Sequence, residues 1–242
     1  EVLVAGILNG LYNDGRLGPL EIARIAQEAE NGYFGKPCGL FDQASCALGG
    51  CVAMDFQDPV SPVLRRLPVR LAEWGFRLCV VNTGGSHTDN TEEFAACRLE
   101  MEAVARFLGG CTLRDVPRER FGQSLPALRH AVGDRAVLRA LHFYEENDRV
   151  RRQCAALERG DAAGFLQQVR ASGRSSQNLL QNISLPDTPR EQGIALALAL
   201  TERFLEGEGA WRVHGGGFAG TIQAYVPVDR VPAYQAYMED LF

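Results

Sequence analysis

Two glycine-rich segments contain the residues whose types and spacing could do chemistry. In residues 35–43, Gly-Lys-Pro-Cys-Gly-Leu-Phe-Asp-Gln, a single carboxylate, Asp42, follows a glycine turn that ends a predicted helix. A carboxylate at such a junction can orient a substrate hydroxyl or accept its proton if it faces a cleft. The alternative from spacing alone is that Asp42 caps the short helix predicted to follow it, because aspartate favours that position.

The second segment, residues 215–220 (Gly-Gly-Gly-Phe-Ala-Gly), separates two predicted strands near the end of the chain. Glycine tolerates positive φ angles and allows the main chain to approach a ligand within hydrogen-bond distance. The segment is not a P-loop, because it lies between two strands and lacks the Lys-Ser/Thr pair. The alternative is an ordinary glycine-rich hairpin.

The composition is that of an ordinary globular protein. The chain has 242 residues, 46% of them apolar and 23% charged, which is enough for a substantial core in one or two domains. A formal net charge of −5 gives no basic surface for nucleic acid or an anionic membrane, and no apolar run is long enough to span one. The seven cysteines form no C-x-x-C pair, and the four histidines lack metal-ligand spacing. We therefore expect reduced thiols in a cytoplasmic protein.

Hydrophobic periodicity predicts the elements that position these segments. Residues 2–11 are apolar nearly all round and predict a buried helix, and a second helix is predicted from Pro19 to Asn31. The run 76–82 predicts a buried strand, whereas the proline-containing stretch before it predicts irregular structure. Asp161 is a predicted N-cap. The pattern indicates an α+β protein with a boundary near residue 84; the further predicted strands are 50–56, 210–214 and 221–227, and the further helices are 44–50, 92–108, 124–131, 134–159, 161–172, 189–206 and 229–241.

Three stretches resemble the signatures of one kinase family. Residues 29–43, Ala-Glu-Asn-Gly-Tyr-Phe-Gly-Lys-Pro-Cys-Gly-Leu-Phe-Asp-Gln, are similar to the galactokinase pattern Ala-Glu-Asn/His, then Phe-x-Gly-x-x-Cys-Gly-(Ile/Leu)-Met-Asp-Gln, except that Phe41 replaces methionine. Residues 212–220, Arg-Val-His-Gly-Gly-Gly-Phe-Ala-Gly, resemble the third signature of the GHMP kinase superfamily, to which galactokinase belongs. Residues 142–150 resemble that family's His-x-x-x-Glu-Asn-x-Arg-Val helix, which we interpret as structural.

The resemblance implies a GHMP-kinase-like α+β fold. Residues 1–84 would be the remainder of the N-terminal domain that binds sugar and ATP, and residues 85–242 a helical region and the C-terminal ferredoxin-like α/β sandwich. It also implies ATP-dependent phosphorylation of galactose at the C1 hydroxyl, with ATP and Mg²⁺ as cofactors and no nucleic-acid or membrane partner. The implied site residues are Asp42 as catalytic residue, Cys38 and Gly39 in the sugar pocket, Glu30 at the metal, and Gly215, Gly216 and Gly217 in the active-site loop.

Some positions depart from the family pattern. Where many galactokinases carry a Glu-Tyr pair whose tyrosine contacts the sugar, this chain has Glu93-Phe94, so Phe94 takes the substrate-binding place without a hydroxyl. His87 and Asp89 either belong to the site or cap a loop. A kinase for another sugar, such as N-acetylgalactosamine or arabinose, is therefore an alternative, and so is a non-catalytic sugar-sensing regulator.

The chain also lacks the N-terminal sugar motif of the family and its serine-rich phosphate loop. It resembles the later part of a galactokinase, truncated at the N-terminus. Because that loop holds the nucleotide phosphates, we expect residues 1–242 alone to be inactive. The oligomeric state stays open.

Overall fold

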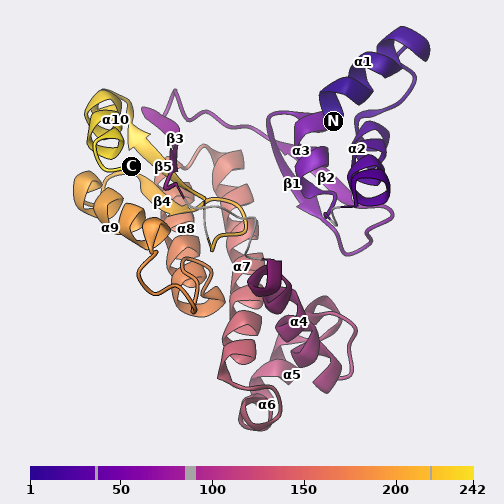
Figure 1. Ribbon diagram of the computed structural model, residues 1–242, viewed down its shortest axis with the longest axis vertical. Coiled ribbons are helices and arrows are strands. Elements are labelled where there is room, and N and C mark those ends of the chain that lie inside the picture. The colour runs from indigo at the N-terminus through magenta and orange to yellow at the C-terminus, as the bar shows by residue number, and fades with distance from the viewer. Residues whose placement is uncertain (36–37, 85–90, 219) are drawn as a thin grey trace. The chain divides into compact units, whose positions relative to one another are not determined.

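A computed structural model describes residues 1–35, 38–84, 91–218 and 220–242 (Figure 1). His87 and Asp89 therefore lie outside the described residues. The chain forms two compact units, Glu1–Val69 and Arg70–Phe242, which are described separately. The division precedes residue 84 because the strand Phe76–Asn82 pairs inside the second unit. The assignment of residues 1–84 and 85–242 to family domains stays a prediction.

The first unit packs helices α1, α2 and α3 beside a two-stranded antiparallel sheet (Figure 1). Its core is small, with Ala23, Leu40 and Ala44 buried where α2 meets α3. Strand β2 was not predicted, because Pro62 and Pro68 flank a strand instead of interrupting it. The elements are α1 Val2–Tyr12, α2 Pro19–Glu28, the π-helical turn η1 Ala29–Phe34, α3 Phe41–Leu48, β1 Cys51–Asp55 and β2 Val63–Leu67.

Helix α1 forms where the sequence predicts it, but the prediction that it is buried is wrong. Leu3 is 75% exposed and Leu11 70% exposed, because α1 packs mainly against α2 and α3. Its one buried residue is Asn9, whose side chain donates to Leu17 O (3.3 Å) and accepts from Leu17 N (3.2 Å). These two hydrogen bonds between the Asn9 side chain and Leu17 hold the turn from α1 to α2 in place.

The second unit combines helices with a three-stranded sheet. The prediction that Asp161 caps a helix is confirmed, since its Oδ1 accepts from Gly164 N at 2.8 Å. The helices are α4 Thr91–Phe107, α5 Arg118–Gln123, α6 Leu125–Val132, α7 Asp134–Arg159, α8 Ala162–Ser175, η3 Ser176–Leu180, α9 Gly193–Leu205 and α10 Val231–Glu239, with short 3₁₀ turns η2 Leu113–Asp115 and η4 Val228–Arg230. The strands are β3 Phe76–Asn82, β4 Ala210–Val213 and β5 Thr221–Pro227.

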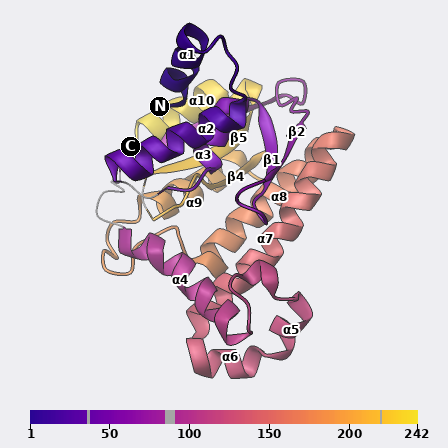
Figure 2. The same cartoon turned by 90° about the vertical axis from the view of Figure 1, so that its right-hand side faces the viewer.

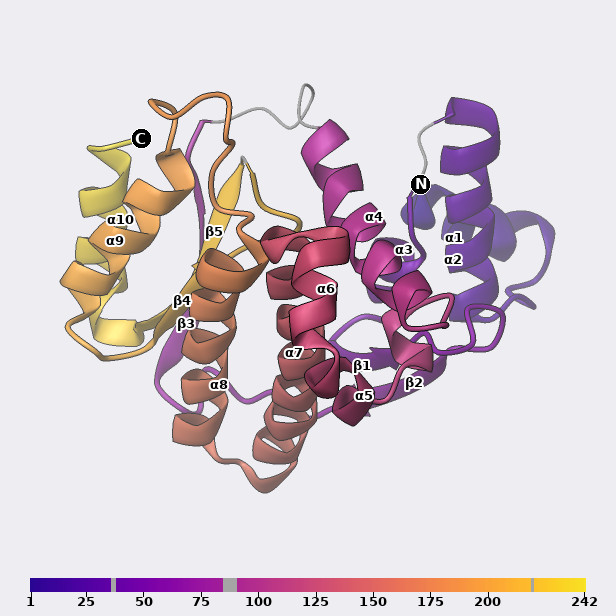
Figure 3. The same ribbon diagram turned by 90° about the horizontal axis from the view of Figure 1, so that it is seen from below.

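The sheet lies between two layers of helices (Figure 3). Its order is β3-β5-β4, and both pairings are antiparallel, with Phe76 opposite Pro227 and Ala210 opposite Tyr225. Alternate residues of β5, such as Ile222, enter the core with α9 and α10. Tyr225 points to the opposite face, where its ring lies 5.5 Å from that of Phe165 on α8. This alternation is what a central strand covered on both faces requires.

The predicted strand 76–82 is present with the expected bounds, but its burial differs from the prediction. Leu78 is 47% exposed and Val80 54% exposed, whereas Cys79 and Val81 pack against the core that α9 and α10 cover. The reason is that β3 is an edge strand with only one covered face.

A second core joins α4, α6 and α7 at the other end of the unit (Figures 1 and 2). It is purely helical, and Val104, Leu128 and Ala140 are fully buried in it. The mixture of helices and small antiparallel sheets confirms the predicted α+β class. Among the described residues, no helix combines the length and apolarity that crossing a membrane requires.

Candidate active site

Asp42 lies in the first turn of α3, one residue after its first residue Phe41. The capping alternative is wrong, because Leu40 occupies the N-cap position and makes no side-chain cap hydrogen bond. The carboxylate is exposed to solvent, and a negative charge in a first turn interacts favourably with the helix dipole. Gly35, at φ 77°, ends the preceding π-helical turn and so turns the chain toward α3.

A polar cluster made of Glu30, Cys38 and Gln43 lies beside this turn. Gln43 Nε2 donates to Glu30 Oε2 at 2.8 Å and to Cys38 Sγ at 3.2 Å, and Cys38 Sγ donates to Glu30 Oε2 at 3.3 Å. Gln43 is buried, and its Oε1 has no hydrogen-bond partner among the described residues. The Gln43 side-chain amide on α3 thus orients the Glu30 carboxylate on η1.

The backbone of Cys38 is held from α2 and η1. Asn31 Oδ1 accepts from Cys38 N at 2.7 Å, and Asn31 Nδ2 donates to Cys38 O at 3.2 Å. Gln27 Nε2 donates to the same oxygen at 3.1 Å. These bonds fix the backbone position of Cys38.

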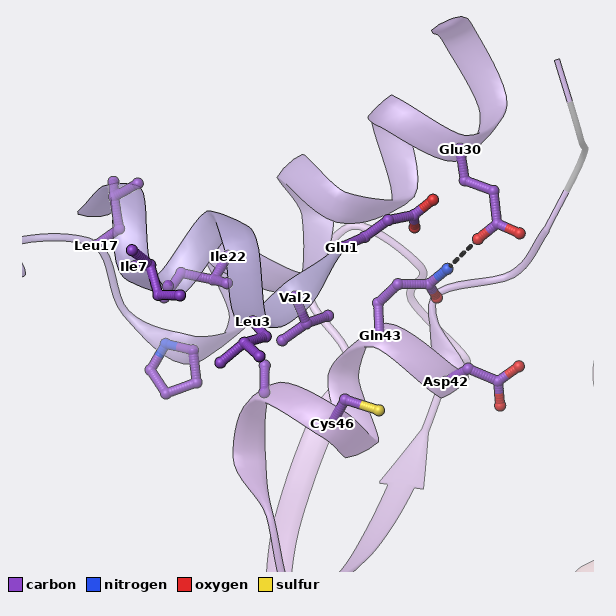
Figure 4. A pocket seen from close by; sticks show the side chains of 13 residues that line it. Glu1, Val2, Leu3, Ile7, Leu17, Ile22, Glu30, Asp42, Gln43 and Cys46 are labelled. Carbon is purple, nitrogen blue, oxygen red and sulfur yellow. Dashed lines mark hydrogen bonds between the residues drawn. The ribbon is translucent and has the colours of Figure 1, made fainter. Parts of the chain in front are cut away.

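A cavity of about 910 Å³ in the first unit contains Asp42, Glu30 and Gln43 in its lining (Figure 4). Apolar side chains such as Ile7 and Ile22 lie at one end, and the polar groups lie at the other. The structure therefore brings two predicted site residues, Asp42 and Glu30, to one cavity. The predicted sugar-pocket residues Cys38 and Gly39 do not line it, although Cys38 bonds to Glu30 and Gln43.

The glycine loop belongs to the second unit and connects β4 to β5. His214 N donates to Thr221 O at 3.0 Å, which closes the hairpin. Gly215 and Gly217 have φ angles of 69° and 87°, so both need the freedom of glycine. The apex at Gly215 is exposed, whereas Gly217 at the base is buried.

Asn182, which no motif identified, contacts this loop at two points. Its Nδ2 donates to Gly216 O at 2.9 Å, and its main-chain oxygen accepts from Phe218 N at 2.5 Å. A Cβ at Gly217 would lie 2.0 Å from Asn182 O, which explains why glycine is required there. Asn182 lies in a loop of unremarkable composition, so no signal in the sequence could have found it.

Phe94 packs against the same loop. Its ring meets that of Phe218 edge to face, with centroids 5.3 Å apart, and a Cβ at Gly216 would lie 2.3 Å from Phe94 Cε1. Phe94 and the glycine loop, both predicted as site elements, are thus in contact. The sugar contact of Phe94 stays a prediction.

Ion pairs with α7 anchor the helix that carries Phe94. Arg139 is only 1% exposed, and it contacts Glu100 at 2.9 Å and Glu93 at 3.7 Å. Arg135 contacts the same two carboxylates at 2.6 and 3.6 Å but is 41% exposed. Burial raises the pKa of the Cys97 thiol, which lies in the field of these charges.

The helix motif at residues 142–150 forms a buried polar network. Arg149 donates to Glu146 Oε2 at 2.6 Å and to Ser175 Oγ at 2.5 Å, while His142 Nδ1 lies 2.9 Å from that same oxygen. Burial lowers the pKa of His142. Burial raises the pKa of Glu146, but hydrogen bonds from Ser172 and Arg149, together with the positive charges of Arg212 and Arg149, outweigh this and lower it overall.

Galactokinases match the chain over most or all of its length. The galactokinase of Streptomyces coelicolor is 34% identical over 247 residues, which cover 100% of this chain and 59% of the relative. A galactokinase of Actinobacillus pleuropneumoniae is 33% identical over 220 residues, covering 91% of this chain and 54% of that protein. The family model for the GHMP kinases N terminal domain matches residues 1–50. The chain is thus similar to GHMP kinases, and to galactokinases in particular, along its whole length.

Solved structures of GHMP kinases share the fold. The Lactococcus lactis galactokinase complexed with galactose matches with a TM-score of 0.73 at 23% identity, covering 98% of this chain and 59% of that one. The L. major mevalonate kinase in complex with R-mevalonate matches with a TM-score of 0.60 at 16% identity, covering 97% and 57%. The chain thus spans somewhat more than half the length of the relatives it matches.

Proposed function

We propose that this chain is part of a galactokinase that transfers a phosphoryl group from ATP to the C1 hydroxyl of galactose. The observation that carries the proposal is that Asp42 and Glu30, two carboxylates of the galactokinase-like segment, line one cavity. At about 910 Å³ the cavity is within the size range of small-molecule sites. The similarity to galactokinases along the whole chain supports the choice of reaction.

In this proposal Asp42 acts on the acceptor sugar. Its exposed carboxylate at the start of α3 can accept a hydrogen bond from the C1 hydroxyl and take the proton as the phosphoryl group arrives. Phosphoryl transfer depends mainly on such positioning and on charge stabilisation. Cys38 and Gly39 remain candidates for sugar contacts, because hydrogen bonds fix the backbone of Cys38, which precedes Gly39.

The same cavity offers a group suited to the metal ion that accompanies a nucleotide. The described residues contain no cluster of three or more His, Cys, Asp or Glu that could hold a metal alone. Glu30 offers one carboxylate, which suits a magnesium ion held mostly by ATP phosphates and water. When bound, that ion would neutralise charge on the phosphates.

The proposal is tested on the complete product of the gene that encodes this chain. ADP release is measured with galactose, N-acetylgalactosamine and arabinose, and we expect galactose to give the largest kcat/KM. A larger kcat/KM with one of the other two sugars would show that galactose is not the preferred substrate and would support the alternative kinase. Calorimetric binding of galactose without ADP release would instead support the sugar-sensing regulator. The seven cysteines, all of them in the described part of the chain, form no disulfide, which supports the further proposal of a cytoplasmic protein.

The role of Asp42 is tested with Asp42→Asn. We expect kcat to fall by about 10² to 10⁴-fold, because the amide cannot accept the hydroxyl proton. Since Asp42 is exposed, the melting temperature should stay within about 2 °C of the parent's. The matched control is Asp187→Asn, another exposed aspartate, which should leave kcat unchanged. Retention of full activity in Asp42→Asn would refute the assigned role.

A further inference from the structure

Asn182 connects the end of η3 to the glycine loop of the second unit. It is 2% exposed, and its two hydrogen bonds reach Gly216 O through the side chain and Phe218 N through the main chain. Asn182 therefore holds both ends of the stretch 216–218, which follows the exposed apex at Gly215 and contains the buried base of the loop. The missing Cβ of Gly217 allows this close approach.

The stretch that Asn182 holds has an unusual backbone. Phe218 has a φ of 61°, which is strained for a residue with a side chain and persists only when the surroundings enforce it. Asn182 enforces it through the Phe218 amide, and the ring of Phe94 packs on Phe218. The apex is open, since a Cβ at Gly215 would meet no atom within 4 Å. The loop is thus fixed at its base and accessible at its tip.

Contacts made by the residues before and after Asn182 hold it in place. Arg139 Nε donates to Leu180 O at 3.2 Å, two residues before Asn182, and the same arginine pairs with Glu100 on α4. Ile183, which follows Asn182, is part of the core of the sheet. The segment that presents Asn182 is therefore tied both to the helices and to the sheet.

The side chain of Asn182 is buried but only half satisfied in its hydrogen bonds, so it adds little to stability. Its Oδ1 is buried and has no hydrogen-bond partner within the described part of the chain, which offsets the gain from the Nδ2 bond. A buried amide that is only half satisfied is better explained by the geometry it imposes on the loop than by stabilisation.

We propose that Asn182 is a positioning residue that presets the conformation of the glycine loop for phosphoryl transfer, a role that rests on the proposed kinase function. It touches no reacting atom. Its effect passes through Gly216 and Phe218, which set the direction of the open apex.

The first test measures the loop directly in residues 1–242. Asn182→Ala removes the Nδ2 bond and the unpaired Oδ1 together, so the melting temperature should stay within about 2 °C of the parent's. Amide hydrogen exchange at Phe218 should become about tenfold faster, because loss of the side-chain bond to Gly216 O leaves its main-chain bond to residue 182 as the remaining tie and the stretch opens more often. The matched control is Asn178→Ala, an exposed asparagine in η3, which should change neither quantity. Unchanged exchange in Asn182→Ala would overturn the proposal.

The second test measures catalysis in the complete gene product. Asn182→Ala and the isosteric Asn182→Asp, which lacks the donor, should both lower kcat by about tenfold to hundredfold. The KM for the sugar should change by less than about threefold, a split that general destabilisation would not produce. A looser loop with unchanged kcat would overturn the positioning role. If the parent phosphorylates no sugar, the proposed function and the catalytic role fail together, and the exchange data alone decide whether Asn182 holds the loop.

Discussion

At the level of single residues, the two carboxylates of the cavity are held in different ways. Glu30 Oε2 accepts hydrogen bonds from Gln43 and Cys38, so its orientation is determined by its neighbours. Asp42 is exposed at the start of a helix, where the helix dipole favours its charge. In the proposed function, the fixed carboxylate would hold the metal ion and the exposed one would exchange a proton with the substrate.

His142 illustrates how burial couples a residue to pH. Ser175 Oγ accepts from Arg149, so the hydroxyl proton of Ser175 can be donated to His142 Nδ1, an arrangement that requires the neutral ring. Burial lowers the pKa of His142 in agreement with this. A histidine with a lowered folded-state pKa contributes stability that is present above its unfolded pKa of about 6.5 and is lost as pH falls through the folded pKa.

We therefore expect the free energy of unfolding to decrease as pH falls from about 7.5 to 5.5, by at most about 1.4 kcal/mol per pH unit from this one group. The measurement is urea unfolding across that range. His142→Gln should show a shallower slope than the parent, and the exposed His130→Gln should show the parent's slope. Identical slopes in all three proteins would show that His142 does not carry the dependence.

At the level of elements, α4 is placed by charge and the glycine loop by steric fit. The buried Arg139 joins α7 to two acidic side chains of α4, and this fixes the helix turn that carries Phe94. The β4–β5 loop then packs against Phe94 at Gly216, where only a residue without a side chain fits.

The ion pairs of α4 and α7 give a comparison between a buried and an exposed arginine. Arg139→Met should lower the free energy of unfolding by about 1–3 kcal/mol, because Leu180 O and Glu100 each lose a hydrogen bond from a buried donor, although Arg135 still pairs with the carboxylate. Arg135→Met should cost only about 0–1 kcal/mol, because Arg135 is 41% exposed and solvent screens its ion pairs. Denaturant unfolding of both variants measures the difference, and equal losses would contradict this account.

The glycine loop gives a second comparison. Gly215→Ala and Gly217→Ala both place a side chain at positive φ, which costs each variant about 1 kcal/mol. Only Gly217→Ala also collides with Asn182 O, so it should lose about 1–3 kcal/mol more. Thermal unfolding measures both variants. If Gly215→Ala were the more damaging substitution, the packing described for the loop would be wrong.

At the level of the whole molecule, the two units differ in how well each can support itself. Among the described residues, the second unit has a buried cluster around the sheet and another among α4, α6 and α7. The cluster described in the first unit is smaller, with Ala23, Leu40 and Ala44 buried, and most apolar side chains of α1 are exposed. Short chains with small cores are marginally stable on their own.

We expect residues 70–242 alone to unfold cooperatively on heating and residues 1–69 alone to show no cooperative transition. Circular dichroism melts of the two pieces and of residues 1–242 measure this. A sharp transition in residues 1–69 would mean that the small cluster suffices. Loss of cooperativity in residues 70–242 would mean that its clusters do not form an independent core.

The amino-acid sequence by itself determined the elements with strong local signals. The helix at 134–159, the strand at 76–82 and the cap at Asp161 follow from periodicity and local chemistry. The signature segments also predicted Asp42, Glu30 and the glycine loop as site residues, and these roles stay predictions. Only the tertiary structure decided which faces are covered. In that structure α1 and one face of β3 are exposed, and Asn182 hydrogen-bonds to Gly216, 34 positions away in the chain. The physical reason is that burial and such contacts depend on which distant elements pack together, and a local pattern carries no information about those partners.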